Sequence, residues 1–538
     1  MTSISKNGAN GIKHCKTRLV LLVWPANNLS QNNNAPQNAT LNVYQESLTC
    51  MNGYFMKQAS QFLRGGAIDL TISVLLVLLI SGCATRPKND RLDLVDPERG
   101  YRPRLIMENR DNNDPATFFV MSFSGGGTRA AALSYGVLEE LNRYHFPGRD
   151  RQHRLIDEVD VITGVSGGSF TALSYALYGD RLFEEYETRF LKRDVQGDLM
   201  RRSLLNPVNW FRQMSGNFGR SELAAEYYDE ILFKGATYND LIDNGRPAAI
   251  ATGTVLSSGA RLGFYQDDFD LLCSDLGTLH LSRAAATSSA VPAALSPVTL
   301  DNFGGNCAYQ YPAWVRDAVH PAAGSEPSAR ALQRYREMRM LQDSANHPYL
   351  HLVDGGVADN LGVRGVLEAL EELSFSGSFR KQTGFGGIRR VVLIVVNAQS
   401  KQPKNWDLKE SPPNTLQQTL QSSGVPIAHY TFETVELMKK LVKEASWQRQ
   451  LDIAEARLAG ASKEEAEAMY PAVDMLVFDI GFDAIRDAEE RAYFQSLPTS
   501  FVLPPEAVDR LREVAGKLLH QSPVFQKVLN EVGAERIP

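Results

Sequence analysis

Apolar and polar positions follow two regular patterns along the chain. Short apolar runs rich in β-branched residues have the length of buried strands, and between them apolar positions recur every three or four residues, as in helices. Strands are predicted at 117–123, 157–163, 248–255, 261–267, 349–353, 390–397 and 474–480. Strands that alternate with helices predict a layered α/β domain with a largely parallel sheet.

The helical pattern becomes dominant toward the C-terminus. Helices are predicted, for example, over 434–458 and 505–519. We therefore divide most of the chain into two parts. Residues 116–400 are predicted to form the α/β domain, and residues 401–538 are predicted to form a mainly helical C-terminal extension packed on it.

A short apolar segment at 68–80 lies behind two basic residues, Lys57 and Arg64. It is shorter than a comfortable membrane-spanning helix, and its basic lead and small-residue ending have the form of a secretory signal. The ending Ile80-Ser81-Gly82-Cys83 resembles a bacterial lipobox, which implies that Cys83 is lipidated and begins the mature protein. A signal anchor or a buried helix is the alternative.

This signal divides the N-terminal part of the chain. Residues 1–55 are polar and Asn-rich and are predicted to be a disordered upstream extension, because a later methionine gives the signal a more conventional start. Residues 56–82 are then the lipoprotein signal peptide, and 83–115 hold the lipidated cysteine and a polar tether. We expect a lipoprotein on the periplasmic face of a bacterial membrane, and Ala84 favours the outer membrane.

Composition narrows the function classes. The chain has 538 residues, of which 43% are hydrophobic and 22% charged, as in an ordinary globular enzyme. Its formal net charge of −6, without a basic arm or zinc-ligand spacing, argues against general nucleic-acid binding. Cys273 and Cys307 are the cysteines left beyond Cys83. In an oxidising compartment they can pair in a disulfide, and two buried free thiols are the equal alternative.

The segment Gly164-Val165-Ser166-Gly167-Gly168 follows the second predicted strand. A G-x-S-x-G motif between a strand and a helix is the form of a nucleophile elbow, a sharp turn that presents a serine hydroxyl above the sheet. Gly164 and Gly168 leave room for this crowded turn. Ser166 is therefore the candidate nucleophile, at a helix N-terminus that favours developing negative charge.

A run of three glycines, Gly125, Gly126 and Gly127, stands between the first predicted strand and its helix. Glycines let backbone N–H groups turn toward a bound oxygen, so this loop is the candidate oxyanion hole. Arg129 either steadies the loop or attracts an anionic head group, and a solvated helix residue is the alternative. The glycines also fit a dinucleotide fingerprint, but the next strand lacks its ribose-binding acid.

Asp354 ends the strand predicted at 349–353 and precedes Gly355 and Gly356. Side chains at this edge of an α/β sheet gather in active sites, although Asp-Gly is also a common turn pair. Asp354 is therefore the candidate base. A free aspartate has a pKa of about 4 and is a poor base toward serine, so the site must desolvate it and stabilise the oxyanion strongly.

Together these motifs resemble those of the patatin-like phospholipase family. The chain carries SGGGTRA at 124–130, GVSGG at 164–168 and DGG at 354–356, in the family's order, with a similar small-residue block at 284–295. One departure is Ser124, where many members have Asp. The resemblance covers roughly residues 117–400 and implies a three-layer α/β/α fold.

The resemblance also implies a mechanism. Ser166 would be the nucleophile, Asp354 the base, and the N–H groups around Gly125–Gly127 the oxyanion hole. We therefore expect a membrane-anchored serine lipid acylhydrolase, similar to phospholipase A or lysophospholipase, that cleaves carboxylic esters of glycerolipids. No cofactor or metal is expected, and the sequence has no EF-hand-like spacing for calcium.

Two other functions stay open. A Ser-His-Asp esterase or thioesterase of soluble substrates needs a histidine, and we interpret His351, His429 and His520 as structural. The chain can also be a non-catalytic lipid-binding lipoprotein. The segment 200–215 mixes apolar residues with arginines, which is typical either of a bilayer surface or of a core-packed helix with solvated arginines.

Overall fold

The computed structural model describes part of the chain. The described residues are 85–110, 113–147, 153–214, 218–320, 327, 329–368, 387–401 and 406–537. The chain divides into residues 1–81 and residues 82–538, and the fold described below is that of the second unit. The predicted extension at 1–55, the predicted signal at 56–82 and Cys83 lie outside the described residues.

The secondary structure alternates strands with helices, as the pattern of the sequence predicts. The strands are β1 (Asp90–Arg91), β2 (Thr117–Phe123), β3 (Tyr144–His145), β4 (Val161–Gly164), β5 (Ala248–Val255), β6 (Arg261–Gly263), β7 (Ser274–Asp275), β8 (Val298–Asp301), β9 (Tyr349–Asp354), β10 (Arg390–Asn397), β11 (Asp474–Gly481) and β12 (Glu535–Arg536). The α-helices are α3 (Pro103–Glu108), α4 (Thr128–Leu141), α5 (Gly167–Tyr178), α6 (Leu182–Tyr186), α7 (Val195–Leu205), α8 (Pro207–Met214), α9 (Arg220–Tyr228), α10 (Gln266–Leu271), α11 (Leu281–Ser288), α12 (Ala313–Val319), α13 (Ala329–Leu341), α14 (Gly356–Asp359), α17 (Thr415–Leu458), α18 (Lys463–Met469), α19 (Ala488–Ser496), α20 (Pro505–Gln521) and α21 (Pro523–Val532).

The main sheet has the strand order β11-β10-β2-β4-β5-β9-β8, with β6 added beside β5. The pairs from β11 to β5 are parallel, whereas β9 runs antiparallel to both β5 and β8. Every residue of β2 is buried, because helices cover both faces of a parallel sheet. The predicted α/β/α fold with a mainly parallel sheet is confirmed.

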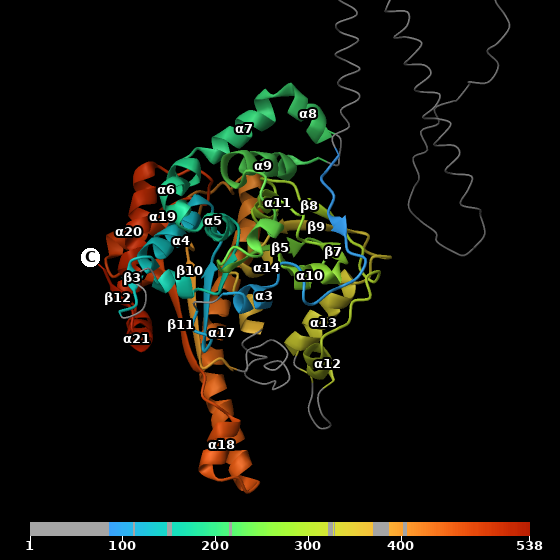
Figure 1. Ribbon diagram of the computed structural model, residues 1–538. Helices are drawn as coiled ribbons and strands as arrows, with labels where there is room; N and C mark the ends of the chain where they lie inside the picture. The colour runs from blue at the N-terminus through green and yellow to red at the C-terminus, as the bar shows by residue number, and fades with distance from the viewer. Residues whose placement is uncertain are drawn as a thin grey trace, which may run out of the picture. The chain divides into compact units, whose positions relative to one another are not determined.

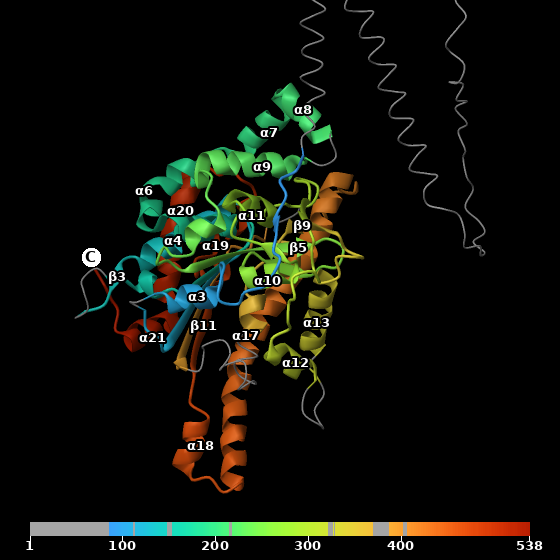
Figure 2. The same ribbon diagram turned by 45° about the vertical axis from the view of Figure 1, so that its right-hand side comes forward.

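Helices enclose this sheet on two sides. In Figures 1 and 2, α4, α5 and α20 lie on one side of the strands and α17 lies on the other. α20 packs along α4, and α4 packs on α5. The C-terminal part of the chain is therefore built into the domain, since it supplies the edge strand β11 as well as helices.

Two helical hairpins project from opposite ends of the folded unit. Figures 1 and 2 show α7 and α8 above one end of the sheet, and the far part of α17 with α18 beyond the other end. None of the helices among the described residues is both long enough and apolar enough to cross a bilayer.

The residues before β2 pack on the body, in contrast to the polar tether expected at 83–115. β1 pairs with β7, and the Tyr101 side chain is fully buried with its hydroxyl bonded to the backbone of Ala249 in β5. The Arg102 guanidinium forms a buried ion pair with Asp270 at 2.7 Å. A flexible tether would not form such buried contacts. Residues 85–110 are therefore part of the fold.

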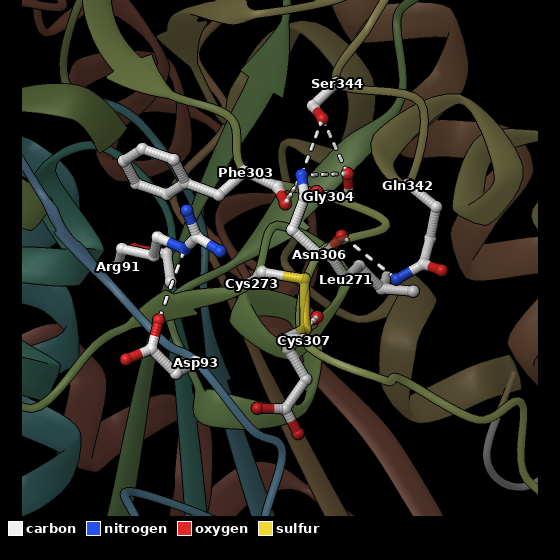
Figure 3. The surroundings of a disulfide bond; sticks show 12 residues. Arg91, Asp93, Leu271, Cys273, Phe303, Gly304, Asn306, Cys307, Gln342 and Ser344 are labelled. Atoms are coloured by element: carbon white, nitrogen blue, oxygen red, sulfur yellow. Dashed lines mark hydrogen bonds and ion pairs between the residues drawn. A yellow bond between two sulfur atoms is a disulfide. The ribbon is translucent and has the colours of Figure 1, made fainter.

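A disulfide joins Cys273 to Cys307 beside this N-terminal segment (Figure 3). The carbonyl of Cys273 accepts a hydrogen bond from Leu92, and the carbonyl of Cys307 accepts one from Val95. The cross-link therefore also holds the two backbone acceptors that fasten residues 92–95. Of the two states that the sequence left open, the structure has the pair bonded.

Candidate active site

Ser166 lies at the sharp turn between β4 and α5. Its backbone has φ 49° and ψ −120°, a strained conformation for a residue with a side chain. Only 5% of the residue is exposed. Such strain persists where the surroundings determine the backbone, and this is the geometry expected of a nucleophile elbow.

Three glycines make room for the turn. A Cβ on Gly164 would come within 2.6 Å of the first turn of α5, and a Cβ on Gly168 within 2.5 Å of the Phe123 carbonyl oxygen. The closest approach is at Gly167, where a Cβ would lie 2.0 Å from the carbonyl oxygen of Gly127. The G-x-S-x-G motif predicts the roles of Gly164 and Gly168, but it gives no role to Gly167, its variable position.

Asp354 faces this serine from the end of β9. The Asp354 carboxyl accepts a hydrogen bond from the Gly356 N–H group at 2.7 Å. Burial raises the pKa of Asp354 to about 7, and interactions with the Gly356 N–H group and the Ser166 hydroxyl oppose that rise. A carboxylate with a pKa near neutral pH is much better suited to accept a proton from serine than a free aspartate is.

The Asp-Gly-Gly turn is fixed by β5. Thr254 donates a hydrogen bond from its hydroxyl to the Asp354 carbonyl at 2.9 Å. A Cβ on Gly355 would lie 2.5 Å from the Thr252 carbonyl oxygen, so the turn approaches the strand more closely than a side chain permits. The Gly356 N–H group is the one that reaches the carboxyl.

Ser288, the last residue of α11, connects the two halves of the site. Its hydroxyl oxygen accepts a hydrogen bond from the Ser166 N–H group at 2.9 Å, and its carbonyl accepts one from Gly355 at 3.3 Å. Nearby, the Ala290 carbonyl accepts a hydrogen bond from the Asp354 N–H group at 3.0 Å. Ser288 was not predicted as an individual residue, although it lies in the small-residue block at 284–295.

The glycine loop lies beside Ser166. A Cβ on Gly125 would come within 3.5 Å of the serine Cβ. Gly126 and Gly127 have φ values of 145° and 60°, which favour glycine, and their N–H groups meet no acceptor among the residues that the structure describes. These two N–H groups are therefore free to bind an oxyanion.

The Gly125 N–H group, which we expected in the oxyanion hole, has another partner in the structure. It already donates to the Asn360 carbonyl at 2.9 Å, so this group is not available to a substrate oxygen. A Cβ on Gly125 would also lie 2.5 Å from the Asn360 side-chain oxygen. Gly125 serves the close packing of the loop against the segment that follows α14.

Arg129 steadies the loop from within the protein. Only 2% of the residue is exposed, and burial lowers the pKa of the guanidinium to about 10. Its three nitrogens donate to the Ala398 carbonyl at 2.8 Å, the Leu497 carbonyl at 2.5 Å and the Thr499 hydroxyl at 3.0 Å. All three nitrogens of the guanidinium thus bind groups inside the protein, and the side chain does not face a lipid head group.

The three histidines considered for a triad lie in other surroundings. His351 is exposed and contacts the Thr299 hydroxyl, and His429 is exposed on α17. His520 on α20 hydrogen-bonds Glu140 at 2.7 Å. Within the described ranges, no histidine is hydrogen-bonded to Ser166 or Asp354.

Comparison with known proteins identifies the domain. The family model described as patatin-like phospholipase matches residues 121–367. The sequence matches none of the curated proteins with which it was compared.

Among solved structures, the chain is similar to human GIVD cytosolic phospholipase A2, with 11% identity, a TM-score of 0.38 and coverage of 82% of this chain and 67% of that one. The same human protein in complex with methyl gamma-linolenyl fluorophosphonate gives 12% identity, a TM-score of 0.34 and coverage of 80% and 62%. VipD from Legionella pneumophila gives 12% identity, a TM-score of 0.26 and coverage of 80% and 71%. These structural likenesses are weak, whereas the family match spans the glycine loop, Ser166 and Asp354. Residues 121–367 therefore form a patatin-like phospholipase domain, which supports a lipid ester hydrolase.

Proposed function

We propose that the chain is a membrane-anchored serine acylhydrolase that cleaves glycerolipid esters through a Ser166–Asp354 dyad, as phospholipase A or lysophospholipase enzymes do. One observation carries the proposal. The Ser166 hydroxyl interacts with the buried carboxyl of Asp354, and burial raises the pKa of this carboxyl to about 7. The N–H groups of Gly126 and Gly127, which meet no acceptor within the described ranges, lie in the adjacent loop.

In the first half of the reaction, the Ser166 oxygen attacks the acyl carbonyl and its proton passes to Asp354. A C–O bond forms, and the former carbonyl oxygen becomes an oxyanion that accepts hydrogen bonds from Gly126 and Gly127. Asp354 then returns the proton to the ester oxygen as the tetrahedral intermediate breaks. The lipid alcohol leaves, and the fatty acyl group stays on Ser166.

In the second half, water takes the place of the lipid alcohol. Asp354 accepts a proton from the attacking water, a second tetrahedral intermediate forms in the same oxyanion hole, and the proton returns to the Ser166 oxygen as the fatty acid leaves. Because the pKa of Asp354 is raised to about 7, the carboxyl can accept and release this proton near neutral pH. The dyad therefore needs no histidine.

The proposed location is the periplasmic face of a bacterial membrane, with lipid on Cys83. The lipobox-like ending at 80–83 supports this, and a disulfide between Cys273 and Cys307 suits an oxidising compartment. Mass spectrometry of the mature protein tests it. We expect an N-terminal peptide that begins at a lipid-modified Cys83, and peptides from residues 57–82 in the mature protein would contradict it.

The hydrolase proposal is tested by fatty-acid release from phospholipid, lysophospholipid and neutral-lipid substrates. Ser166→Ala should lower the rate by about 10³-fold or more, whereas Ser257→Ala, in the exposed turn after β5, should leave it unchanged. Equal, low release by the unaltered chain and Ser166→Ala from every lipid would refute an enzyme and favour a lipid-binding protein.

A further inference from the structure

The α7–α8 hairpin presents a compact group of exposed apolar side chains, which we call the apolar tip. Each member is between 50% and 74% exposed: Met200, Leu204, Leu205, Val208 and Trp210. The tip is ordered by its own hydrogen bonds. The Trp210 indole N–H group donates to the Leu204 carbonyl at 2.8 Å, and the Asn206 side chain accepts from Val208 at 3.0 Å. The polar atom of the indole is thus satisfied while half of the residue remains exposed.

The arginines of the hairpin are paired with carboxylates on the protein. Arg201 contacts Asp198 at 2.6 Å, Arg202 contacts Glu230 at 2.8 Å, and Arg212 contacts Glu226. The surface therefore offers apolar contact without a free positive field. This favours the hydrocarbon edge of a bilayer over its anionic head groups, since electrostatic attraction to anionic lipids needs unpaired cations.

The described chain begins on the same side of the molecule as the tip. Arg86 is fixed by an ion pair with Asp301 at 2.5 Å and by a hydrogen bond to the Thr299 carbonyl. That carbonyl also binds Arg283, which pairs with Glu222 on α9, the helix that packs against α7. Figures 1 and 2 both show the start of this blue segment beneath α8. A lipid on Cys83 would therefore hold a bilayer close to the apolar tip.

The base of α7 is connected to the catalytic loop. Gln196 in its first turn exchanges two hydrogen bonds with the backbone of Phe501. The preceding residue, Ser500, accepts a hydrogen bond from Thr128 and lies against Gly127. The hairpin thus rises from the end of the sheet that carries the oxyanion loop.

We propose that the apolar tip inserts into the acyl-chain boundary of the bilayer to which the chain is anchored, and so turns the active site toward its lipid substrate. The occupant is a lipid surface, and the binding is apolar, with little dependence on salt or on anionic lipid. The anchor and the orientation toward substrate rest on the proposed function, whereas the insertion is measured independently of catalysis.

Insertion is measured directly with Trp210. The full-length chain carrying Ser166→Ala is reconstituted in phosphatidylcholine vesicles with or without bromine-labelled acyl chains, and the same is done with Trp210→Phe added. The difference between the two gives the quenching of Trp210 alone. We expect strong quenching by the bromines, equal at low and high salt. Absence of quenching would overturn insertion, and because Ser166 is removed, the result is independent of catalysis.

The functional consequence is measured with paired substitutions. We expect Leu204→Glu with Leu205→Glu to lower the ratio of the vesicle rate to the soluble-ester rate by at least about tenfold. Leu451→Glu with Leu458→Glu on α17 is the matched control, since these leucines are 58% and 89% exposed, and its ratio should stay unchanged. An unchanged ratio in the first pair would contradict the role of the tip in turning the active site toward lipid. A change in oligomeric state with Trp210 unquenched would assign the tip to a protein partner instead.

Discussion

At the scale of single residues, the chemistry depends on how Asp354 is held. The sequence predicts an aspartate at the end of a strand, and the need for desolvation follows from the low pKa of a free carboxyl. The structure supplies the desolvation, because burial raises the pKa of Asp354 to about 7. Ser288 could not be predicted in the same way, because the approach of α11 to both loops is a tertiary contact without a local signal.

Replacement of Asp354 by Asn should lower the activity of the protein and raise its stability. Asp354→Asn should lower the hydrolysis rate by about 10³-fold or more. The folded-state pKa is raised above the unfolded value, so ionisation of the buried carboxyl costs the unaltered chain stability as pH rises from about 4 to about 7. An uncharged amide avoids this cost, which is at most about 4 kcal/mol.

Urea denaturation of both proteins measures this difference. Asn at 354 should be more stable than the unaltered chain at pH 8, and the advantage should shrink toward pH 4. An advantage that grows as pH falls would mean that Asp354 is ionised and stabilising in the folded state, which contradicts its assignment as a desolvated base.

Ser288 is predicted to be a positioning residue. Ser288→Ala removes the acceptor of the buried Ser166 N–H group, and an unsatisfied group of this kind costs about 1–3 kcal/mol. We expect kcat to fall by about 10- to 100-fold with little change in KM, since the turn that carries the nucleophile is misplaced. Ser282→Ala in the same helix is the control, and an equal loss there would mean that the effect is one of general folding.

At the scale of secondary structure, the long apolar strands were predictable from the sequence. At the opposite edge of the sheet, strand β8 and the direction of β9 were not. The predicted spans 117–123, 248–255 and 390–397 coincide with β2, β5 and β10. β8 was missed, and the antiparallel direction of β9 has no signature in its own residues. The helix predicted from residue 434 in fact begins at Thr415 in α17. Its first part was not predicted to be helical because that part is polar and contains Pro426.

The elbow should tolerate no side chain at Gly167. Gly167→Ala places a Cβ 2.0 Å from the Gly127 carbonyl oxygen, so the serine turn and the oxyanion loop must move apart. We expect a loss of about 1–3 kcal/mol in stability together with loss of activity. Gly424→Ala on α17 meets no atom within 4 Å and should instead stabilise the chain by about 0.5–1 kcal/mol. Thermal unfolding distinguishes the two, and a stable, active Gly167→Ala protein would refute the close approach.

At the scale of the whole molecule, the described segment before β2 is fixed to the body. The polar composition of 83–115 predicts a tether, but pairing of β1 with β7 and burial of Tyr101 override composition. The C-terminal part is likewise part of the domain through β11. Both outcomes depend on contacts between distant segments, which the local pattern of a sequence does not encode.

The disulfide should contribute to this fixation. Cys273→Ser with Cys307→Ser opens a cross-link between residues 34 positions apart and should lower the free energy of unfolding by about 2–4 kcal/mol. Because the same two carbonyls hold residues 92–95, proteolysis should become faster near Leu92. Unchanged stability and unchanged cleavage in this segment would show that the cross-link does not hold it.

The most direct test of the dyad is the rate at which a fluorophosphonate labels the chain as a function of pH. We expect a single label on Ser166, with a rate that rises up to about pH 7 and then levels off, as Asp354 loses its proton. Asp354→Asn should abolish labelling, and alanine at His351, His429 or His520 should leave it intact. Labelling that survives in Asp354→Asn, or that is lost with one of these histidines, would contradict the Ser166–Asp354 dyad.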